Sequence, residues 1–178
     1  MDDTLPEDND NAPEPESELE QFQKHANSLR AFDTLGKFLE DDGWYPQRAE
    51  GQYAYWVHYS GSNGDLRCYA QIRLELEQFV VYAMSPVKSP PELLPAVAEF
   101  LTRANYGLGI GNFELRYSDG RIRFKSSLDF EGDELSPNLI RNTIYPAVRI
   151  SNTYLPGLMK VIYGGGSPEE AIAEIEGS

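Results

Sequence analysis

Residues 105–125 read NYGLGIGNFELRYSDGRIRFK, and this stretch decides the fold class more than any other. It begins where a helix is expected to end, because apolar residues between positions 97 and 104 recur at helical spacing. Its second half places two apolar–polar segments on either side of Asp119-Gly120, a dipeptide typical of a hairpin turn. A helix that runs into an antiparallel hairpin favours an α+β fold over a parallel sheet with crossover helices.

Three glycines in this stretch, Gly107, Gly109 and Gly111, raise the question of a phosphate-binding loop. A dinucleotide-binding fingerprint spaces its glycines as G-x-G-x-x-G between a strand and the helix that follows it. Here Asn112 stands where the third glycine would be, and a helix precedes a strand. The carboxyl end of a helix also carries the negative end of its dipole, which repels phosphate. We therefore interpret the glycines as a helix end and a connection, not a nucleotide site.

The residues before this stretch predict an antiparallel meander of three or four strands between positions 44 and 84. Residues 79–84 are apolar on both faces, which is typical of a central strand. A helix is expected on each side of the meander, at about 19–41 and from residues 89–92 onwards. Five apolar residues alternate with polar ones to form one face of a strand: Leu66, Cys68, Ala70, Ile72 and Leu74.

The residues after the hairpin predict a long helix and a short one. The long helix begins at Ser136-Pro137, and Pro146 and Pro156 inside its apolar pattern predict a kink or a break. Residues 164–166, all glycine, separate it from the short helix. The predicted fold class is therefore α+β with an antiparallel sheet of five to six strands. The expected order is helix, three- to four-strand meander, helix, hairpin, long kinked helix and short helix.

Charge is distributed unevenly along the 178 residues, whose formal net charge is −14. Residues 1–20 hold nine acids and no base, whereas the rest of the chain holds 20 acids and 15 Lys or Arg. We predict an acidic disordered tail over residues 1–17, because it cannot bury enough apolar surface to offset its ordering entropy. An α+β domain over 18–163 and a Gly-rich joint with a short C-terminal helix over 164–178 complete the predicted organisation.

Composition also indicates where the protein works. A single cysteine, Cys68, excludes an internal disulfide and suits a reducing cytosol. The acidic first residues lack the basic and apolar pattern of a secretory signal, and no apolar run approaches the roughly 20 residues of a membrane helix. We expect a cytoplasmic protein with no membrane partner. The mildly acidic body disfavours general binding to nucleic acid, which needs a basic surface.

Recognisable catalytic and metal-binding patterns are missing from the sequence. A zinc site needs three or four ligands, and the chain offers only His25, His58 and Cys68 as Cys or His. Residues 129–134 faintly resemble a calcium loop, but the sixth position is not glycine and the twelfth is not glutamate. No G-x-S-x-G nucleophile motif occurs. We therefore predict no enzymatic activity, no catalytic residues, no metal and no cofactor.

The hairpin carries a basic face. With Asp119-Gly120 at its tip, we expect Tyr117 opposite Ile122 and Leu115 opposite Phe124. Arg116 would then lie across from Arg123, a like-charge pair that costs some stability. Such a face is often only a solvated strand surface, but it is also a candidate docking site for an acidic partner or for the protein's own acidic tail. The candidate partner-binding residues are Arg116, Arg121, Arg123 and Lys125.

Another set of features marks helix ends, the hairpin and the start of the last long helix. They are Asn105, Gly111 to Leu115, Asp119-Gly120, Leu135-Ser136, Asn152 and Tyr154 to Leu158. In these features the sequence resembles the YbjN family of small bacterial proteins, over about residues 28 to 163. The longer form of this chain is similar to versions seen in cyanobacteria.

The resemblance implies the architecture of type III secretion chaperones and a link to the regulation of stress, motility and surface phenotypes. It supplies no catalytic residue or cofactor. Secretion chaperones of similar fold are small, acidic and dimeric, and they bind extended segments of a client. The resemblance therefore implies a protein partner and a homodimer.

Three functions are consistent with the sequence. The first is a non-enzymatic protein-binding module, chaperone-like or regulatory, which fits the element order and the aromatic-rich sheet. The second is binding of nucleic acid or another acidic partner through the basic hairpin face. The third is binding of a small ligand in a pocket between sheet and helices. We favour the first, because the body of the protein is acidic and no catalytic constellation is apparent.

Overall fold

The computed structural model describes residues 18–177, apart from the side chains of residues 18, 20–22 and 24. The disordered tail predicted for residues 1–17 lies outside this range. The helices are α1 (Glu18–Asp41), α2 (Leu94–Gly107), α3 (Pro137–Tyr163) and α4 (Pro168–Glu176), with short 3-10 turns η1 (Leu74–Leu76) and η2 (Pro91–Leu93). The strands are β1 (Gln47–Arg48), β2 (Ala54–Gly61), β3 (Gly64–Arg73), β4 (Gln78–Lys88), β5 (Asn112–Arg116) and β6 (Arg121–Asp129).

The strands form one six-stranded sheet in the order β1-β2-β3-β4-β6-β5, and every neighbouring pair is antiparallel. The predicted α+β fold with an antiparallel sheet is therefore confirmed. The central position expected for residues 79–84 is also confirmed, because β4 lies between β3 and β6 and is buried on both faces. The glycine stretch joins α2, which ends at Gly107, to β5, which begins at Asn112.

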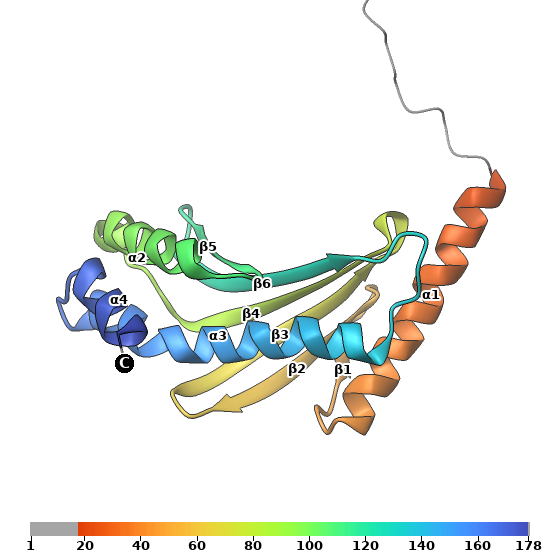
Figure 1. Ribbon diagram of the computed structural model, residues 1–178, viewed down its shortest axis with the longest axis horizontal. Coiled ribbons are helices and arrows are strands. Elements are labelled where there is room, and N and C mark those ends of the chain that lie inside the picture. Colours follow the sequence, from red (N-terminus) through yellow and green to blue (C-terminus); the bar gives the residue numbers. More distant parts are fainter. Residues whose placement is uncertain (1–17, 178) are drawn as a thin grey trace, which may run out of the picture.

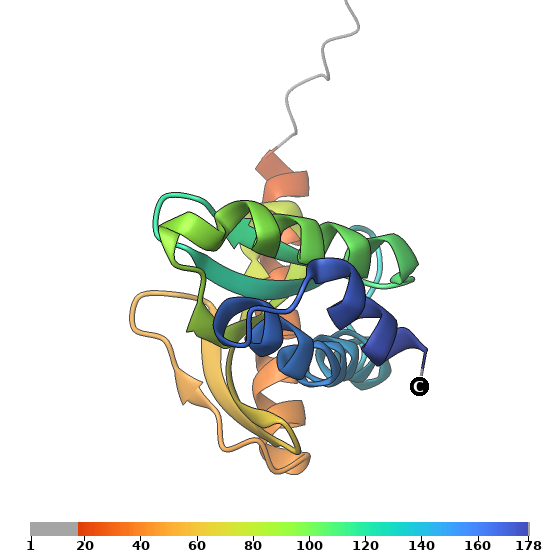
Figure 2. The same ribbon diagram turned by 90° about the vertical axis from the view of Figure 1, so that its left-hand side faces the viewer.

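Helices α2, α3 and α4 lie together on one side of the sheet, and α1 crosses its end near η1 (Figures 1 and 2). Among residues 18–177, no helix covers the opposite face, which we call the open face. No helix in this range is long and apolar enough to cross a membrane. The core lies between α3 and the covered face, whose fully buried side chains include Leu66, Cys68, Ile72, Phe79, Val81 and Phe124.

The register of the β5–β6 hairpin corrects the sequence-based expectation. Leu115 lies opposite Ile122, and Arg116 lies opposite Arg121 rather than Arg123. The difference arises because the turn has four residues, closed by a 2.8 Å bond from the Gly120 N–H to the Arg116 carbonyl. The register therefore slips by two residues, which changes every partner but leaves each side chain on its predicted face.

The sequence predicted a kink or a break at the prolines; helix α3 continues through both of them, so there is no break. A proline at position 156 has no N–H for the carbonyl of Asn152, its i−4 partner. That carbonyl instead accepts a 2.9 Å bond from the Asn63 side chain in the β2–β3 turn. The Asn152 side chain also accepts a 3.0 Å bond from the Ser62 hydroxyl. The proline thus frees a backbone group that holds this turn on the helix.

Asn105 connects the end of α2 to the free edge of β5. Its side-chain oxygen accepts a 2.7 Å bond from the Phe113 N–H, and its amide donates a 3.1 Å bond to the Phe113 carbonyl. The side chain therefore takes the place that a neighbouring strand would occupy. Exposed edges with unpaired backbone groups invite pairing with other chains, so Asn105 both joins two elements and blocks this edge.

Asp42 joins the end of α1 to α3. Its carboxylate accepts bonds of 3.0 Å from the Trp44 indole, 2.9 Å from the Tyr145 hydroxyl and 2.8 Å from Arg141. Burial acts to raise the pKa of Asp42, but these hydrogen bonds and the Arg141 charge outweigh it and hold the pKa below its ordinary value. The group therefore stabilises the fold as a carboxylate.

Candidate functional site

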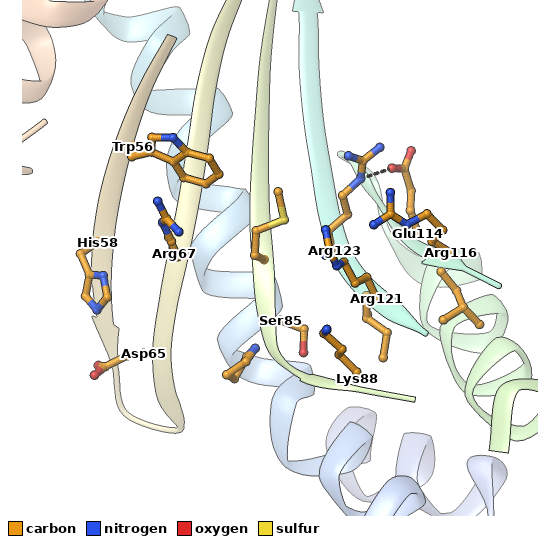
Figure 3. Close-up of a pocket in the computed structure, with 14 residues that line it drawn as sticks. Trp56, His58, Asp65, Arg67, Ser85, Lys88, Glu114, Arg116, Arg121 and Arg123 are labelled. Carbon is orange, nitrogen blue, oxygen red and sulfur yellow. Dashed lines mark hydrogen bonds and ion pairs between the residues drawn. The ribbon is translucent and has the colours of Figure 1, made fainter. Parts of the chain in front are cut away.

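The open face carries a groove of about 890 Å³ that extends from β2 to β5 (Figure 3). In Figure 3, α3 lies behind the strands while the labelled side chains stand on the side that no described helix covers. A row of directly paired residues, one from each of five neighbouring strands, crosses the sheet within this groove. Its members, in the order of the strands, are His58, Arg67, Met84, Arg123 and Glu114.

The hairpin provides one wall of the groove, and its tip fixes the first pair of predicted residues. Arg116 donates to Asp119 at 2.9 Å, and Arg121 lies 3.1 Å from the same carboxylate. The hydrogen bond from Arg116 and the charges of both arginines lower the pKa of Asp119 to about 2. One carboxylate therefore holds two exposed guanidinium groups in place at neutral pH.

The second pair of predicted residues shares Glu114. Arg123 approaches this carboxylate to 2.6 Å and Lys125 to 2.7 Å, and the Arg123 guanidinium also lies 3.9 Å from the centre of the Tyr82 ring. Burial acts to raise the pKa of Glu114, but hydrogen bonds from Lys125 and Arg123 outweigh it and lower the pKa. Arg123 is thus fixed from two sides, whereas Lys125 stands beside the groove and does not line it.

Two further cations of the groove have no acidic partner in the part of the chain that the structure describes. Arg67 on β3 lies 3.9 Å from the centre of the Trp56 ring, and Lys88 ends β4. Both are exposed, and no carboxylate described in residues 18–177 forms an ion pair with either. These are the charges that an incoming anionic group can neutralise without breaking an existing pair.

Backbone contacts hold the hairpin tip against the end of β4. The Ser89 N–H donates a 2.9 Å bond to the Gly120 carbonyl, and Gly120 adopts a positive φ of 68°. A Cβ atom at position 120 would collide with the Ser89 carbonyl. Only glycine satisfies both conditions, so this residue helps to hold the end of β4 beside the start of β6, where Lys88 pairs with Arg121.

The groove is positive in an acidic protein. Its lining contains five Lys or Arg side chains and two carboxylates, a formal charge of +3. Residues 21–178 as a whole carry 15 bases and 20 acids. The cations are therefore concentrated on the open face, where the field of the site attracts anionic groups.

The structure brings Arg116, Arg121 and Arg123 together as predicted, but sequence reasoning missed the opposite wall. Trp56, Arg67 and the end of β4 belong to the same groove. The alternation of β3 did place Arg67 on the polar face. The missing information was the strand order, because only the pairing of β4 with β6 brings that face next to the hairpin.

The residues with catalytic potential are separated. Cys68 is fully buried on the covered face, and burial raises its pKa to about 12, so its thiol is not a nucleophile at neutral pH. His58 lines the groove on the open face. Cys68 pairs with Val57 and shares its face of the sheet, whereas His58, the next residue along β2, points to the opposite face. The groove is chemically suited to hold an anion rather than to activate a nucleophile.

Together these features define a class of protein: a small α+β domain with helices on one face of its sheet and a basic groove on the other. The chain belongs to the YbjN family. The model of this family, described as "Putative bacterial sensory transduction regulator", matches residues 31–159. The family resemblance noted in the sequence is therefore confirmed, and the family's description is of a regulator and names no reaction.

A solved structure supports the same fold. It is described as "Crystal structure of YbjN, a putative transcription regulator from E. coli", and it is similar to this chain with a TM-score of 0.51. The two sequences are 12% identical, and the similarity covers 75% of this chain and 89% of that one. At this identity the likeness concerns the fold alone. A comparison with curated proteins found no match.

Proposed function

We propose that this protein is a non-enzymatic regulator that binds an acidic, extended segment of a protein partner in the groove of the open face. The observation that carries the proposal is a pair of cations, Arg67 and Lys88, which have no acidic partner within residues 18–177 and which line the groove together with the apolar residues Met84 and Pro86. The description of the family as a regulator supports the regulatory part of the proposal.

The geometry favours an extended segment. Neighbouring strands lie about 4.8 Å apart, so a peptide laid across the groove from β2 to β5 passes over about 19 Å, or roughly six extended residues. Carboxylates of such a segment would meet Arg67, Lys88 and Arg121. The guanidinium of Arg123 is already fixed by Tyr82 and Glu114. Groups that are held in place before binding lose less entropy when the partner arrives.

The aromatic residues of the open face argue against nucleic acid. Proteins that bind single strands use exposed aromatic faces on which bases stack. Here Arg67 covers a face of Trp56, and Arg123 covers a face of Tyr82, which is itself buried. The rings serve to orient guanidinium groups. Carboxylates, which guanidinium groups bind in the plane of their N–H donors, are the better match.

Fluorescence anisotropy with two labelled probes of equal charge tests the proposal. One probe is a ten-residue acidic peptide, and the other is a single-stranded oligonucleotide. We expect the full-length protein to bind the peptide more tightly, and the double variant Arg67→Glu/Lys88→Glu to weaken that binding by about tenfold or more. Arg30→Glu/Lys37→Glu, which reverses two exposed charges on α1 and so changes the net charge by the same amount, is the matched control and should bind almost as the wild type does.

Two outcomes of these binding measurements would overturn the proposal. Equal losses in the groove variant and in Arg30→Glu/Lys37→Glu would mean that only the overall charge matters, and would overturn the proposal. Tighter binding of the oligonucleotide would also overturn it and would assign the groove to nucleic acid. Because peptide binding is partly electrostatic, the measured affinity should fall as the salt concentration rises from 50 to 200 mM. This range includes physiological ionic strength, at which charges are screened over about 8 Å.

A further inference from the structure

Helix α4 occupies a trough between α2 and α3, on the side of the molecule that carries the helices (Figure 2). The family match ends at residue 159, so α4 is additional to the region that defines the family. Its apolar stripe faces the trough: Ala171 and Ile172 are buried, and Ile175 is partly buried against the core.

The floor of the trough is shaped for a helix. Gly157 on α3 has no side chain, and a Cβ atom there would lie 2.5 Å from Ile175 and 3.0 Å from Phe100 on α2. Any other residue at position 157 would force the side chains of Ile175 and Phe100 to move. An apolar trough between two helices, lined to accept the apolar stripe of a third, is a recurrent mode of helix recognition.

The rim of the trough supplies donors, and α4 supplies acceptors. Tyr154 donates a 2.8 Å bond to Glu176, and Lys160 forms an ion pair with Glu174. Residues 168–176 contain four glutamates and no base. Burial and the hydrogen bond to Glu176 raise the pKa of Tyr154 to about 12, so its hydroxyl remains a donor. The trough is thus complementary to a helix that is both amphipathic and acidic.

The attachment of α4 is weak for its length. Nine residues are ordered against two buried apolar side chains, Ala171 and Ile172, and two partly buried ones, Pro168 and Ile175, and each ordered residue costs conformational entropy. Helices shorter than about 12 residues are marginal on their own. The joint before α4 consists of three glycines, Gly164–Gly166, of which Gly165 has a φ of 63°. Elements of this kind open at a small fraction of the cost of global unfolding.

We propose that the trough between α2 and α3 is a docking site for an acidic amphipathic helix of a protein partner, and that α4 blocks it in the same chain. The partner must displace α4, so the site is autoinhibited. This surface and the open-face groove lie on opposite sides of the sheet. The occupant is defined by what α4 already satisfies: an apolar stripe over Gly157, with carboxylates at Lys160 and Tyr154.

The test uses the full-length chain and a fluorescein-labelled peptide with the sequence of residues 167–177. The variant Ile175→Asp weakens the docking of α4 and leaves the trough intact. Because the apparent affinity of a blocked site is reduced by the fraction of open molecules, we expect Ile175→Asp to bind the peptide at least tenfold more tightly than the wild type. Adding Lys160→Glu to Ile175→Asp should reverse most of that gain.

Controls separate this site from the groove. A scrambled peptide of the same composition can still bind the groove, so Ile175→Asp should leave its affinity unchanged. The tenfold gain for the native sequence should persist when both proteins carry Arg67→Glu/Lys88→Glu, which removes the contribution of the groove. Hydrogen exchange should show faster exchange in α4 and unchanged protection in β4, which establishes that the variant is folded. Faster exchange in α4 with no gain in peptide affinity would overturn the proposal. A wild-type dimer that Ile175→Asp abolishes would also overturn it, because the trough would then hold α4 of a second copy.

Discussion

Replacing Asn105 with alanine tests how the stretch that decides the fold is held together. The variant removes the two hydrogen bonds that join the end of α2 to the Phe113 backbone, of 2.7 and 3.1 Å. Each such bond contributes about 0.5–1.5 kcal/mol net, and Phe113 is buried, so its backbone groups regain little contact with water. The better helix propensity of alanine returns about 0.5 kcal/mol. We expect Asn105→Ala to lower the free energy of unfolding by about 2 kcal/mol.

Two assays check this value. For a domain of this size, about 2 kcal/mol corresponds to a Tm lower by about 4–8 °C in calorimetry. Hydrogen exchange should show faster exchange of the Phe113 amide, which donates to Asn105. Asn142→Ala is the matched control, because Asn142 is exposed on α3 and its loss should change stability by less than about 0.5 kcal/mol. A Tm for Asn105→Ala equal to that of the control, with Phe113 still protected, would refute the assigned role.

Three further predictions concern charge, the hairpin tip and assembly. The pKa of Asp42 is lowered in the folded state, so the stabilisation by its carboxylate is present above the ordinary pKa of 3.8 and is lost as the pH falls through and below that value. Asp42→Asn should therefore lower the free energy of unfolding by about 1–3 kcal/mol at pH 7 in urea titrations, and by progressively less in acid. An equal cost at every pH would contradict this prediction. Gly120→Ala should lower the free energy of unfolding by about 2 kcal/mol or more, because position 120 has a φ of 68° and approaches the Ser89 carbonyl. Thermal unfolding measures this change, and an unchanged Tm would be evidence against the contact. The resemblance to secretion chaperones predicts a homodimer, which light scattering at tens of micromolar would exclude by returning the monomer mass of 20.1 kDa.

The fold could be predicted from the sequence wherever periodicity decides the structure. The alternation of Leu66, Cys68, Ala70 and Ile72 identified the buried face of β3, and all four are buried, whereas Leu74, the fifth residue of the pattern, lies beyond the strand in η1. The doubly apolar segment 79–84 identified the central strand. Both features depend on the two-residue period of a strand, which the sequence displays directly.

The hairpin register and the groove needed information that periodicity does not contain. Asp119-Gly120 marked the turn, but the bond from Gly120 to the Arg116 carbonyl made the turn one of four residues and shifted the register by two. The groove depends on which strands are neighbours. Arg67 and the hairpin arginines meet only because β4 pairs with β6 across a chain separation that includes α2. Lateral order in a sheet is a tertiary property, so the second wall of the groove could not be derived.

The central claim, that the groove binds an acidic segment of a protein, is tested most directly by photo-crosslinking from within the groove. A photoreactive residue in place of His58, which lines the groove, would be activated in native lysate, and the same residue in place of Lys37 would serve as the control. Mass spectrometry then identifies the crosslinked segment. We predict protein segments rich in Asp and Glu, crosslinked from position 58, absent from position 37, and lost on Arg67→Glu/Lys88→Glu. Crosslinks to nucleic acid, or the same proteins captured from both positions, would contradict the account.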